Sequence, residues 1–300
     1  MNSQPLAGAA RPGLLRDTLI TALVPIMWGS TFIVTSELLP PGRPLWAALL
    51  RTLPAGVLLL ALYREWPRRA DWGRLLLLSL LNIGLFQALL FTAAYRLPGG
   101  IAAVAGSAQT LVVLGLMWAV LGQAPRPAAA LACCMGVLGM GVMLISPESH
   151  FDAIGVAAAL GGALCFGTAV FLGKHWSLRL SLPALAGWQL LLGGLMLLPA
   201  ALLFDTPLPK LTPTHMLAYG YLGLFGALLA YLLWFRGLQR LPAVAVASLG
   251  LLSPVTAVML GWLLLGQSLG LQAQLGMVMV LGSVLAVQLM GSAPGGHSRR

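Results

Sequence analysis

Polar side chains that suit a binding site are scattered through long apolar runs of this 300-residue chain. They are Ser, Thr, Asn, Gln, Trp and Tyr, which form hydrogen bonds without carrying a charge. Aromatic walls with a few amides and hydroxyls suit a neutral or zwitterionic solute with an apolar body, such as an amino acid. The candidate cavity residues are Trp28, Ser30, Thr31, Asn82, Gln87, Ser107, Gln109, Thr168, Tyr231, Ser248 and Ser253, with Trp188 and Gln189 as further interior groups.

Each of these residues also has a structural interpretation, because Ser, Thr, Asn and Gln in membrane helices commonly hydrogen-bond between helices. Trp28 stands out because it lies near the middle of its apolar run, whereas most other tryptophans lie near run ends, as interfacial tryptophans do. Asn82 and Gln109 are also far from the ends of their runs. We therefore expect Trp28, Asn82 and Gln109 to be the leading solute contacts.

Away from the ends of the apolar runs, Arg51 is the one residue with a formal charge, whereas Arg74 and Asp152 stand at run ends. It follows Pro44 by seven residues, or roughly 10 Å along a helix. In a structural role, the guanidinium extends outward or bonds to helix-end carbonyls or Glu37. In a functional role, it clamps a substrate carboxylate. A single interior cation also argues against sugar phosphates and nucleotide sugars, whose two or more negative charges require several Lys or Arg.

Catalytic, metal and nucleotide motifs are missing from the sequence. We find no G-x-x-x-x-G-K-[ST] phosphate loop, no H-E-x-x-H and no pair of Asp residues inside an apolar run. Cys133, Cys134 and Cys165 have no His or carboxylate neighbours, and the four histidines lie outside the apolar runs or at a run end. We therefore predict that the protein is not an enzyme, has no catalytic or metal-ligating residues, and uses no cofactor and no ATP.

The composition indicates which elements must position the polar residues. The chain is 59% hydrophobic and 8% charged, with a mean hydropathy of +0.92, too apolar for a water-soluble globule of this size. A helix needs roughly 20 mostly apolar residues to span a bilayer. Ten runs qualify: 18–36, 44–63, 73–94, 98–121, 127–146, 152–173, 182–204, 214–235, 242–264 and 268–290. The predicted fold class is all-α, with ten transmembrane helices.

The distribution of Lys and Arg predicts the orientation. If the N-terminus is cytoplasmic, thirteen of these residues lie on the inner side and three, Arg43, Arg96 and Lys210, on the outer side. Such a bias follows the positive-inside rule, so we expect both termini in the cytoplasm of a bacterial-type inner (plasma) membrane. The net charge of +10 is then a topology signal and indicates no nucleic-acid partner.

An internal repeat divides the chain in two. Residues 96–123 and 240–267 both begin with Arg-Leu-Pro and end with Leu-Gly-Gln, and IGLFQALL (83–90) resembles LGLFGALL (222–229). A weaker echo pairs 28–31 with 166–169, and the separations are 144, 139 and 138 residues. Two copies of a five-helix unit must cross the membrane in opposite directions, which predicts inverted repeats around a central cavity. The expected parts are a tail (1–17), a first repeat (18–146), a second repeat (152–290) and a C-terminal tail (291–300).

Ten spans in two halves, PIMWGSTFIVTS (25–36), the Leu-Leu-Arg ending at Arg51 and the two W-x-x-L-G-x phrases resemble EamA-type transporters of the drug/metabolite transporter superfamily. The resemblance covers 18–290 and is strongest to the YddG-type exporters of aromatic and other amino acids. It implies alternating access through a cavity lined by spans one, three, four, six, eight and nine. It also places span two at the periphery, which favours the structural role of Arg51. Where the family commonly has Leu-Gly-Glu, this chain has Gln123 and Gln267.

We therefore expect a secondary transporter that exports small neutral or zwitterionic metabolites, most of all amino acids. Because no Asp, Glu, Lys or His lies inside the spans away from their ends, we expect transport down the solute gradient without a proton relay. The alternatives are an exporter of drugs or quaternary cations, held by aromatic faces, and a non-transporting membrane scaffold. Pro254, in the middle of span nine, is a candidate kink that either gates the cavity or widens it.

Overall fold

The computed structural model describes residues 13–96, 106–144, 152–266 and 268–292, and this part of the chain contains helices and no strand. The helices are α1 (Leu14–Leu38), α2 (Pro44–Tyr63), η1 (Arg69–Asp71), α3 (Trp72–Ser79), η2 (Leu80–Gly84), α4 (Leu85–Arg96), α6 (Gln109–Leu121), α7 (Pro127–Leu144), α8 (Ala153–His175), α9 (Leu182–Phe204), α10 (Pro213–Tyr221), η3 (Leu222–Leu229), α11 (Ala230–Arg240), α12 (Ala243–Leu249), α13 (Leu252–Leu265) and α14 (Leu271–Ser292).

These helices follow the predicted apolar runs closely. Eight helical stretches of the described chain are long and apolar enough to cross a membrane, and Gln109–Leu121 and Pro127–Met143 are shorter apolar helices. The shorter two belong to the predicted spans four and five, whose remaining residues lie outside the described part. The all-helical prediction is confirmed for the described residues.

Local sequence explains where several helices begin. Asp152 accepts a hydrogen bond from the Gly155 amide at the start of α8 (2.6 Å), and Ser181 plays the same role for α9. Thr212 and His215 form a reciprocal capping box at the start of α10. Such side chains satisfy amide donors that have no partner inside the helix, which fixes the first residue of each helix.

Two of the long helical stretches contain π-helical turns, which are rare. η2 interrupts the stretch made of α3 and α4, and η3 lies between α10 and α11. η3 coincides with the phrase 222–229, and η2 overlaps the first two residues of its counterpart, 83–90. A π turn shifts the backbone hydrogen bonds by one residue and frees a carbonyl for other donors, so both duplicated stretches have unusual backbone acceptors at similar positions.

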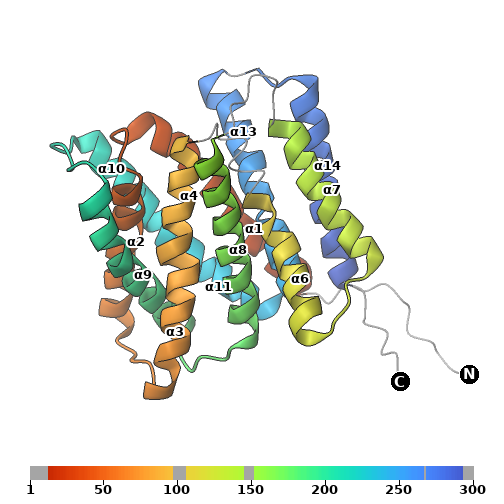
Figure 1. The fold of residues 1–300 in the computed structure, drawn as a ribbon, viewed down its shortest axis with the longest axis horizontal. Coiled ribbons are helices and arrows are strands. Elements are labelled where there is room, and N and C mark those ends of the chain that lie inside the picture. The colour runs from red at the N-terminus through yellow and green to blue at the C-terminus, as the bar shows by residue number, and fades with distance from the viewer. Residues whose placement is uncertain (1–12, 97–105, 145–151, 267, 293–300) are drawn as a thin grey trace, which may run out of the picture.

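Helix pairs at the two flanks pack very closely. Figure 1 shows α7 beside α14 at one flank and α2, α9 and α10 at the other, with α1, α8 and α11 between them. Glycines allow the close approach: a Cβ on Gly56 of α2 would lie 2.4 Å from the Leu191 nitrogen of α9, and one on Gly276 of α14 would lie 2.4 Å from the Met143 nitrogen of α7. Small residues at crossings are typical of helix packing in membranes.

The start of α1 and the end of α14 lie on the same side of the bundle. Asp17, at the start of α1, forms ion pairs with Arg236 and Arg240 at the end of α11. Gln288, near the end of α14, donates to the Ala245 carbonyl at the start of α12, directly after α11. We call this side the basic end; the opposite end carries Arg96 and Asp152.

Span nine is broken rather than kinked. α12 ends at Leu249 and α13 begins at Leu252, and the turn between them uses short bonds from Gly250 to Ala247 and from Leu251 to Ser248 (3.1 Å each). Pro254 lies in the first turn of α13, where its missing N–H cannot bond to the Gly250 carbonyl. The helix distortion predicted at Pro254 thus lies four residues earlier, at Gly250.

Span four has a similar break at Ala108, just before α6, although no proline lies there. The partners of the two breaks also match. A Cβ on Gly29 of α1 would lie 2.5 Å from the Ser253 carbonyl oxygen, and one on Gly167 of α8 would lie 2.9 Å from the Gln109 carbonyl oxygen. Each broken span is therefore crossed at its break by a glycine of another long helix.

Candidate functional site

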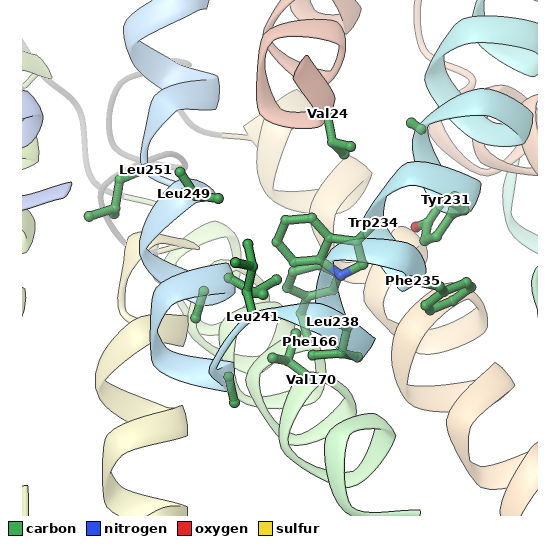
Figure 2. Packing of buried hydrophobic residues seen from close by; sticks show 14 of the residues in the cluster. Val24, Phe166, Val170, Tyr231, Trp234, Phe235, Leu238, Leu241, Leu249 and Leu251 are labelled. Atoms are coloured by element: carbon green, nitrogen blue, oxygen red, sulfur yellow. The ribbon is translucent and has the colours of Figure 1, made fainter. Parts of the chain in front are cut away.

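An aromatic cluster lies at the centre of the bundle, made of Trp28 on α1, Phe86 on α4, Phe166 on α8, and Tyr231 and Trp234 on α11. The Trp28 ring centroid is 5.0 Å from Trp234, 5.6 Å from Tyr231 and 5.8 Å from Phe166, and Phe86 stacks on Phe166 at 4.6 Å. Figure 2 shows Trp234 directly beside Phe166, with Tyr231 and Phe235 on the same helix. Four long helices from both chain halves thus meet at one set of rings.

The Gly226 carbonyl is a shared acceptor next to this cluster. It accepts hydrogen bonds from Trp28 Nε1 (3.1 Å) and from Arg51 Nη2 (2.7 Å). Gly226 lies in the π turn η3, where the shifted backbone bonds leave carbonyls free, and the absence of a side chain lets the guanidinium approach. The tryptophan predicted to contact a solute and the buried cation Arg51 therefore converge on one backbone oxygen.

Arg51 is almost fully buried, with 3% of its surface exposed. It forms no ion pair with any described carboxylate, and its Nε has no hydrogen-bond partner among the described residues. Arg51 does not bond to Glu37, one of its two expected structural partners, because Glu37 accepts from Ser36. It does bond to a backbone carbonyl, but this carbonyl lies in a π turn and not at a helix end. The structure thus buries a cation whose charge no described anion neutralises.

Two interior amides have unused oxygen atoms. Gln87 donates to the Tyr231 hydroxyl (3.1 Å), and Asn82 donates to Gln189 Oε1 (3.0 Å). Gln87 Oε1 and Asn82 Oδ1 are buried and have no donor in the described part of the chain. Most buried polar atoms in folded proteins are satisfied, so such atoms mark places where a ligand or water can bind.

Asn82 and Gln189 form one wall of a pocket of about 250 Å³ at the basic end, between η2, α8, α9 and α11. We call it the basic-end pocket. Its lining comprises Leu78, Asn82, Ala169, Gly173, Lys174, Trp176, Ser177, Leu178, Leu185, Gln189, Phe235, Leu238 and Gln239. Its lining includes span seven, through Leu185 and Gln189, which the resemblance did not include among the cavity spans.

Ser30 and Thr31 lie on α1, one turn from Trp28. The Ser30 hydroxyl is 2.7 Å from the Tyr221 hydroxyl of α10, and the buried Thr31 hydroxyl has no partner among the described residues. Tyr221 was missed in the sequence, although it stands 139 residues after Asn82, the separation of the second repeat. That spacing is the sequence signal by which Tyr221 could have been found.

Ser107, Gln109 and Ser253 lie at the two broken spans. The Gln109 side chain packs against Gly250, and the Ser253 carbonyl faces Gly29 of α1. Ser107 is buried beside the break in span four, and Thr168 of α8 is half-buried one helical turn before Phe171. These residues surround the breaks and lie apart from the shared Gly226 acceptor.

Ser248 and Trp188 are both buried and bond to groups outside the aromatic cluster. Ser248 donates to the Ala245 carbonyl and accepts from Gln288 of α14, so it joins two helices. Trp188 Nε1 donates to the Glu65 carbonyl (2.8 Å), and its ring packs against Trp66 and Trp72 at the basic end.

Ion pairs at both ends of the bundle were also missed. At the basic end, Asp17 bonds to Arg236 and to Arg240 (3.2 Å); at the opposite end, Arg96 bonds to Asp152 (3.4 Å). The duplicated Arg-Leu-Pro phrases contain Arg96 and Arg240, so each copy supplies one of the pairs. In the pair at the opposite end, the Arg96 side chain is 45% exposed and the Asp152 side chain 39% exposed.

The described cysteines form no disulfide bond with one another. Cys133 and Cys165 are buried, Cys134 is exposed, and all three are free thiols. No group of three His, Cys, Asp or Glu side chains within the described ranges is arranged to hold a metal ion.

These observations define a multi-pass helical membrane protein whose interior carries aromatic and uncharged polar groups together with one cation. The chain belongs to the EamA-like transporter family, which matches residues 17–145 and 153–289. It is therefore a membrane transporter of the drug/metabolite transporter superfamily, which binds a solute and lies in the lipid bilayer.

Several named relatives agree with this family. The chain is 39% identical over 267 residues to protein PecM of Dickeya dadantii (strain 3937), covering 88% of this chain and 89% of PecM. It is 24% identical to the uncharacterized inner membrane transporter YicL of Salmonella typhimurium, covering 94% of this chain and 97% of that one. A solved crystal structure has the same fold with a TM-score of 0.75 at 18% identity, covering 92% of this chain and 98% of that one.

Proposed function

We propose that this transporter exports amino acids, including aromatic ones, by alternating access in the bacterial inner membrane, with both termini in the cytoplasm. One observation carries the substrate assignment: Arg51 and Trp28 bond to the same Gly226 carbonyl. A solute at that point meets a cation and an aromatic wall together. A carboxylate pairs with the guanidinium while an apolar side chain packs on the rings.

The remaining groups near Trp28 suit the other end of such a solute. The Tyr231 ring packs against Trp28, and its hydroxyl accepts from Gln87, whose Oε1 has no described donor. An ammonium group donates three hydrogen bonds and accepts none, so an amide oxygen is a suitable partner. The unpaired charge of Arg51 supports this role, because ionisable groups at membrane depth usually serve function. The proposal therefore assigns Arg51 to the carboxylate, in place of the structural role favoured by the sequence.

Inverted repeats at residues 18–146 and 152–290 provide the means of alternating access. The family match in two segments supports this division. So does the matching of contacts across it, in which α2 packs on η3 as α9 packs on η2, and α1 packs on α13 as α8 packs on α6. A cavity between such halves opens to one side or the other when one half rocks against the other.

The ion pairs at the two ends suit the closed positions of such a cycle. The pairs of Asp17 join α1 to α11 at the basic end, and the Arg96–Asp152 pair joins α4 to α8 at the other. Breaking one while keeping the other separates helices at one end only. The solute gradient supplies the energy in this proposal, since the predicted spans contain no Asp, Glu, Lys or His away from their ends.

The test is counterflow of radiolabelled solutes in liposomes containing the purified protein, with amino acids, sugars and cationic drugs as competitors. We expect aromatic amino acids to compete best, and Trp28→Ala and Gln109→Ala to reduce transport without reducing membrane expression. Competition by cationic drugs alone would favour the drug-exporter alternative, and no flux of any solute would favour a scaffold. Uphill movement driven only by an imposed pH gradient would contradict gradient-driven export.

A further inference from the structure

We propose that the basic-end pocket is a loading site that binds the amino group of a solute through Asn82 Oδ1 before the solute reaches Trp28. This inference rests on the proposed export of amino acids. The pocket lies between η2, α8, α9 and α11, and its volume of about 250 Å³ is near the lower limit of ordinary small-molecule pockets, roughly 300 Å³. It therefore fits a single small metabolite.

Asn82 belongs to the pocket lining and has a buried acceptor without a described donor. The amide nitrogen of Asn82 is engaged by Gln189, which is itself 2% exposed, and this bond fixes the orientation of the Asn82 amide. Asn82 is 3% exposed, and its Oδ1 has no partner among the residues the structure describes. A buried acceptor that lacks a donor is costly, so a ligand N–H at this place relieves an existing penalty.

The other walls determine what surrounds that N–H. Leu185, Phe235 and Leu238 provide apolar and aromatic surface for a side chain. Lys174 also lines the pocket, and its ammonium group donates to the carbonyls of Leu238 (2.8 Å) and Gln239 (3.3 Å). A second cation beside Lys174 is repelled unless the ligand also carries a negative charge. The pocket thus favours a zwitterion over a simple amine.

Two elements connect the pocket lining with the central rings. Asn82 and Gln87 belong to one long helical stretch and are five residues apart, or about 7 Å along its axis. Both have a buried amide oxygen without a described donor. Phe235 lines the pocket and also packs against Tyr231, the partner of Gln87. An amino group released by Asn82 therefore meets the next free acceptor at Gln87.

The experiment measures occupancy of this pocket alone. A fluorophore that responds to its environment is attached to Ser177→Cys, an exposed position in the pocket lining, after the exposed Cys134 is changed to Ser. Phenylalanine, phenethylamine and 3-phenylpropionate are titrated as zwitterion, cation and anion. Asn82→Leu removes the acceptor, Asn82→Asp keeps it and adds a negative charge, and Ser79→Ala is the control, because Ser79 is buried one turn earlier and bonds only to Leu75.

We expect the parent to bind phenylalanine more tightly than either analogue. Asn82→Leu should weaken phenylalanine binding about tenfold or more, the usual effect of losing a hydrogen bond to a charged group, without weakening 3-phenylpropionate. Asn82→Asp should strengthen phenethylamine and weaken 3-phenylpropionate, which a misfolded variant cannot do, and Ser79→Ala should match the parent. Equal loss of all three ligands in both Asn82 variants, or no change in either, would overturn the proposal.

The outcome separates this inference from the proposed function. Selective loss of phenylalanine in Asn82→Leu supports the pocket even if the parent protein shows no amino-acid flux in liposomes, in which case amino-acid export is the part that fails. Flux of amino acids combined with unchanged binding in the Asn82 variants leaves export standing and refutes the loading site.

Discussion

Replacing Arg51 by methionine separates a structural from a substrate-binding role, because the two roles predict opposite results. Met keeps an unbranched apolar side chain and removes the charged guanidinium. In the protein, Arg51 is buried and makes a single 2.7 Å bond to the Gly226 carbonyl. Removal of the guanidinium does not orphan that oxygen, because Trp28 Nε1 still donates to it.

The expected effect on stability is small or favourable. A hydrogen bond to a charged group contributes about 1.5–3 kcal/mol, whereas the desolvation of an unpaired charge costs several kcal/mol. Since no described carboxylate pairs with Arg51, the penalty is not recovered in the folded protein. We therefore expect Arg51→Met to melt in detergent at the same temperature as the parent or at a higher one.

The expected effect on transport is large and specific to the carboxylate. Loss of a guanidinium–carboxylate contact of about 1.5–3 kcal/mol weakens binding by about tenfold to 150-fold. Counterflow in liposomes should show this increase in the half-saturating concentration of phenylalanine but not of phenylalaninol, which lacks the carboxylate. Arg51→Lys should retain part of the effect, since Lys keeps the charge without the planar fork.

Thr52→Val is the matched control, because Thr52 is the next residue of α2 and its buried hydroxyl bonds only to carbonyls of its own helix, Ala48 and Leu49. It should leave the ratio between the two solutes unchanged. A lower melting temperature together with equal weakening of phenylalanine and phenylalaninol in Arg51→Met would show that Arg51 is structural, and the reasoning above would then be wrong.

Three further predictions concern packing, the broken span and the ends of the bundle. Gly193→Ala should destabilise the protein by about 1–3 kcal/mol, because the new Cβ would lie 2.3 Å from Ile83 Cβ, whereas Gly220→Ala, with open space around it, should melt as the parent does. Pro254→Ala restores an N–H that can bond to the Gly250 carbonyl; if the break moves during transport, turnover should fall severalfold at unchanged half-saturation, and an unchanged turnover would indicate a static break. Asp17→Asn removes both ion pairs at the basic end, so spin labels on Leu15 and Gln239 should move apart, and an unchanged distance distribution would exclude a latch there.

The sequence predicted the helices well because membrane spans depend on long apolar runs, which are a property of composition. The predicted limits 44–63 and 182–204 coincide with α2 and α9. It predicted the centre of the site less completely. Trp28 and Tyr231 were identified from type and depth, but their meeting with Arg51 at the Gly226 carbonyl depends on a π turn, which no residue pattern in a Leu/Gly-rich stretch specifies.

Residue type alone does not give the direction of a side chain. Ser248 and Trp188 were chosen because they are polar or aromatic residues in apolar runs, and their direction around the helix brings them to Gln288 and to the Glu65 carbonyl. Asp17 and Asp152 were passed over because they stand at span ends, where charges are usual. Their partners, Arg240 and Arg96, were already visible as the first residues of the duplicated phrase.

The two halves of the chain differ at matching places, and this difference fits directional handling of a zwitterion. Arg51 and Gln189 are separated by 138 residues, as Trp28 and Phe166 are, and each bonds to the π turn of the other helix pair, Gly226 for Arg51 and Asn82 for Gln189. One copy presents a cation and the other a pair of amides with a free oxygen. The solute carboxylate is attracted to the cation and the solute amino group to the free amide oxygen. A difference at one duplicated position is therefore enough to orient a zwitterion between two otherwise similar halves. Were Arg51→Gln combined with Gln189→Arg to preserve the preference for phenylalanine over phenylalaninol, the axis would depend on the scaffold and not on these two side chains.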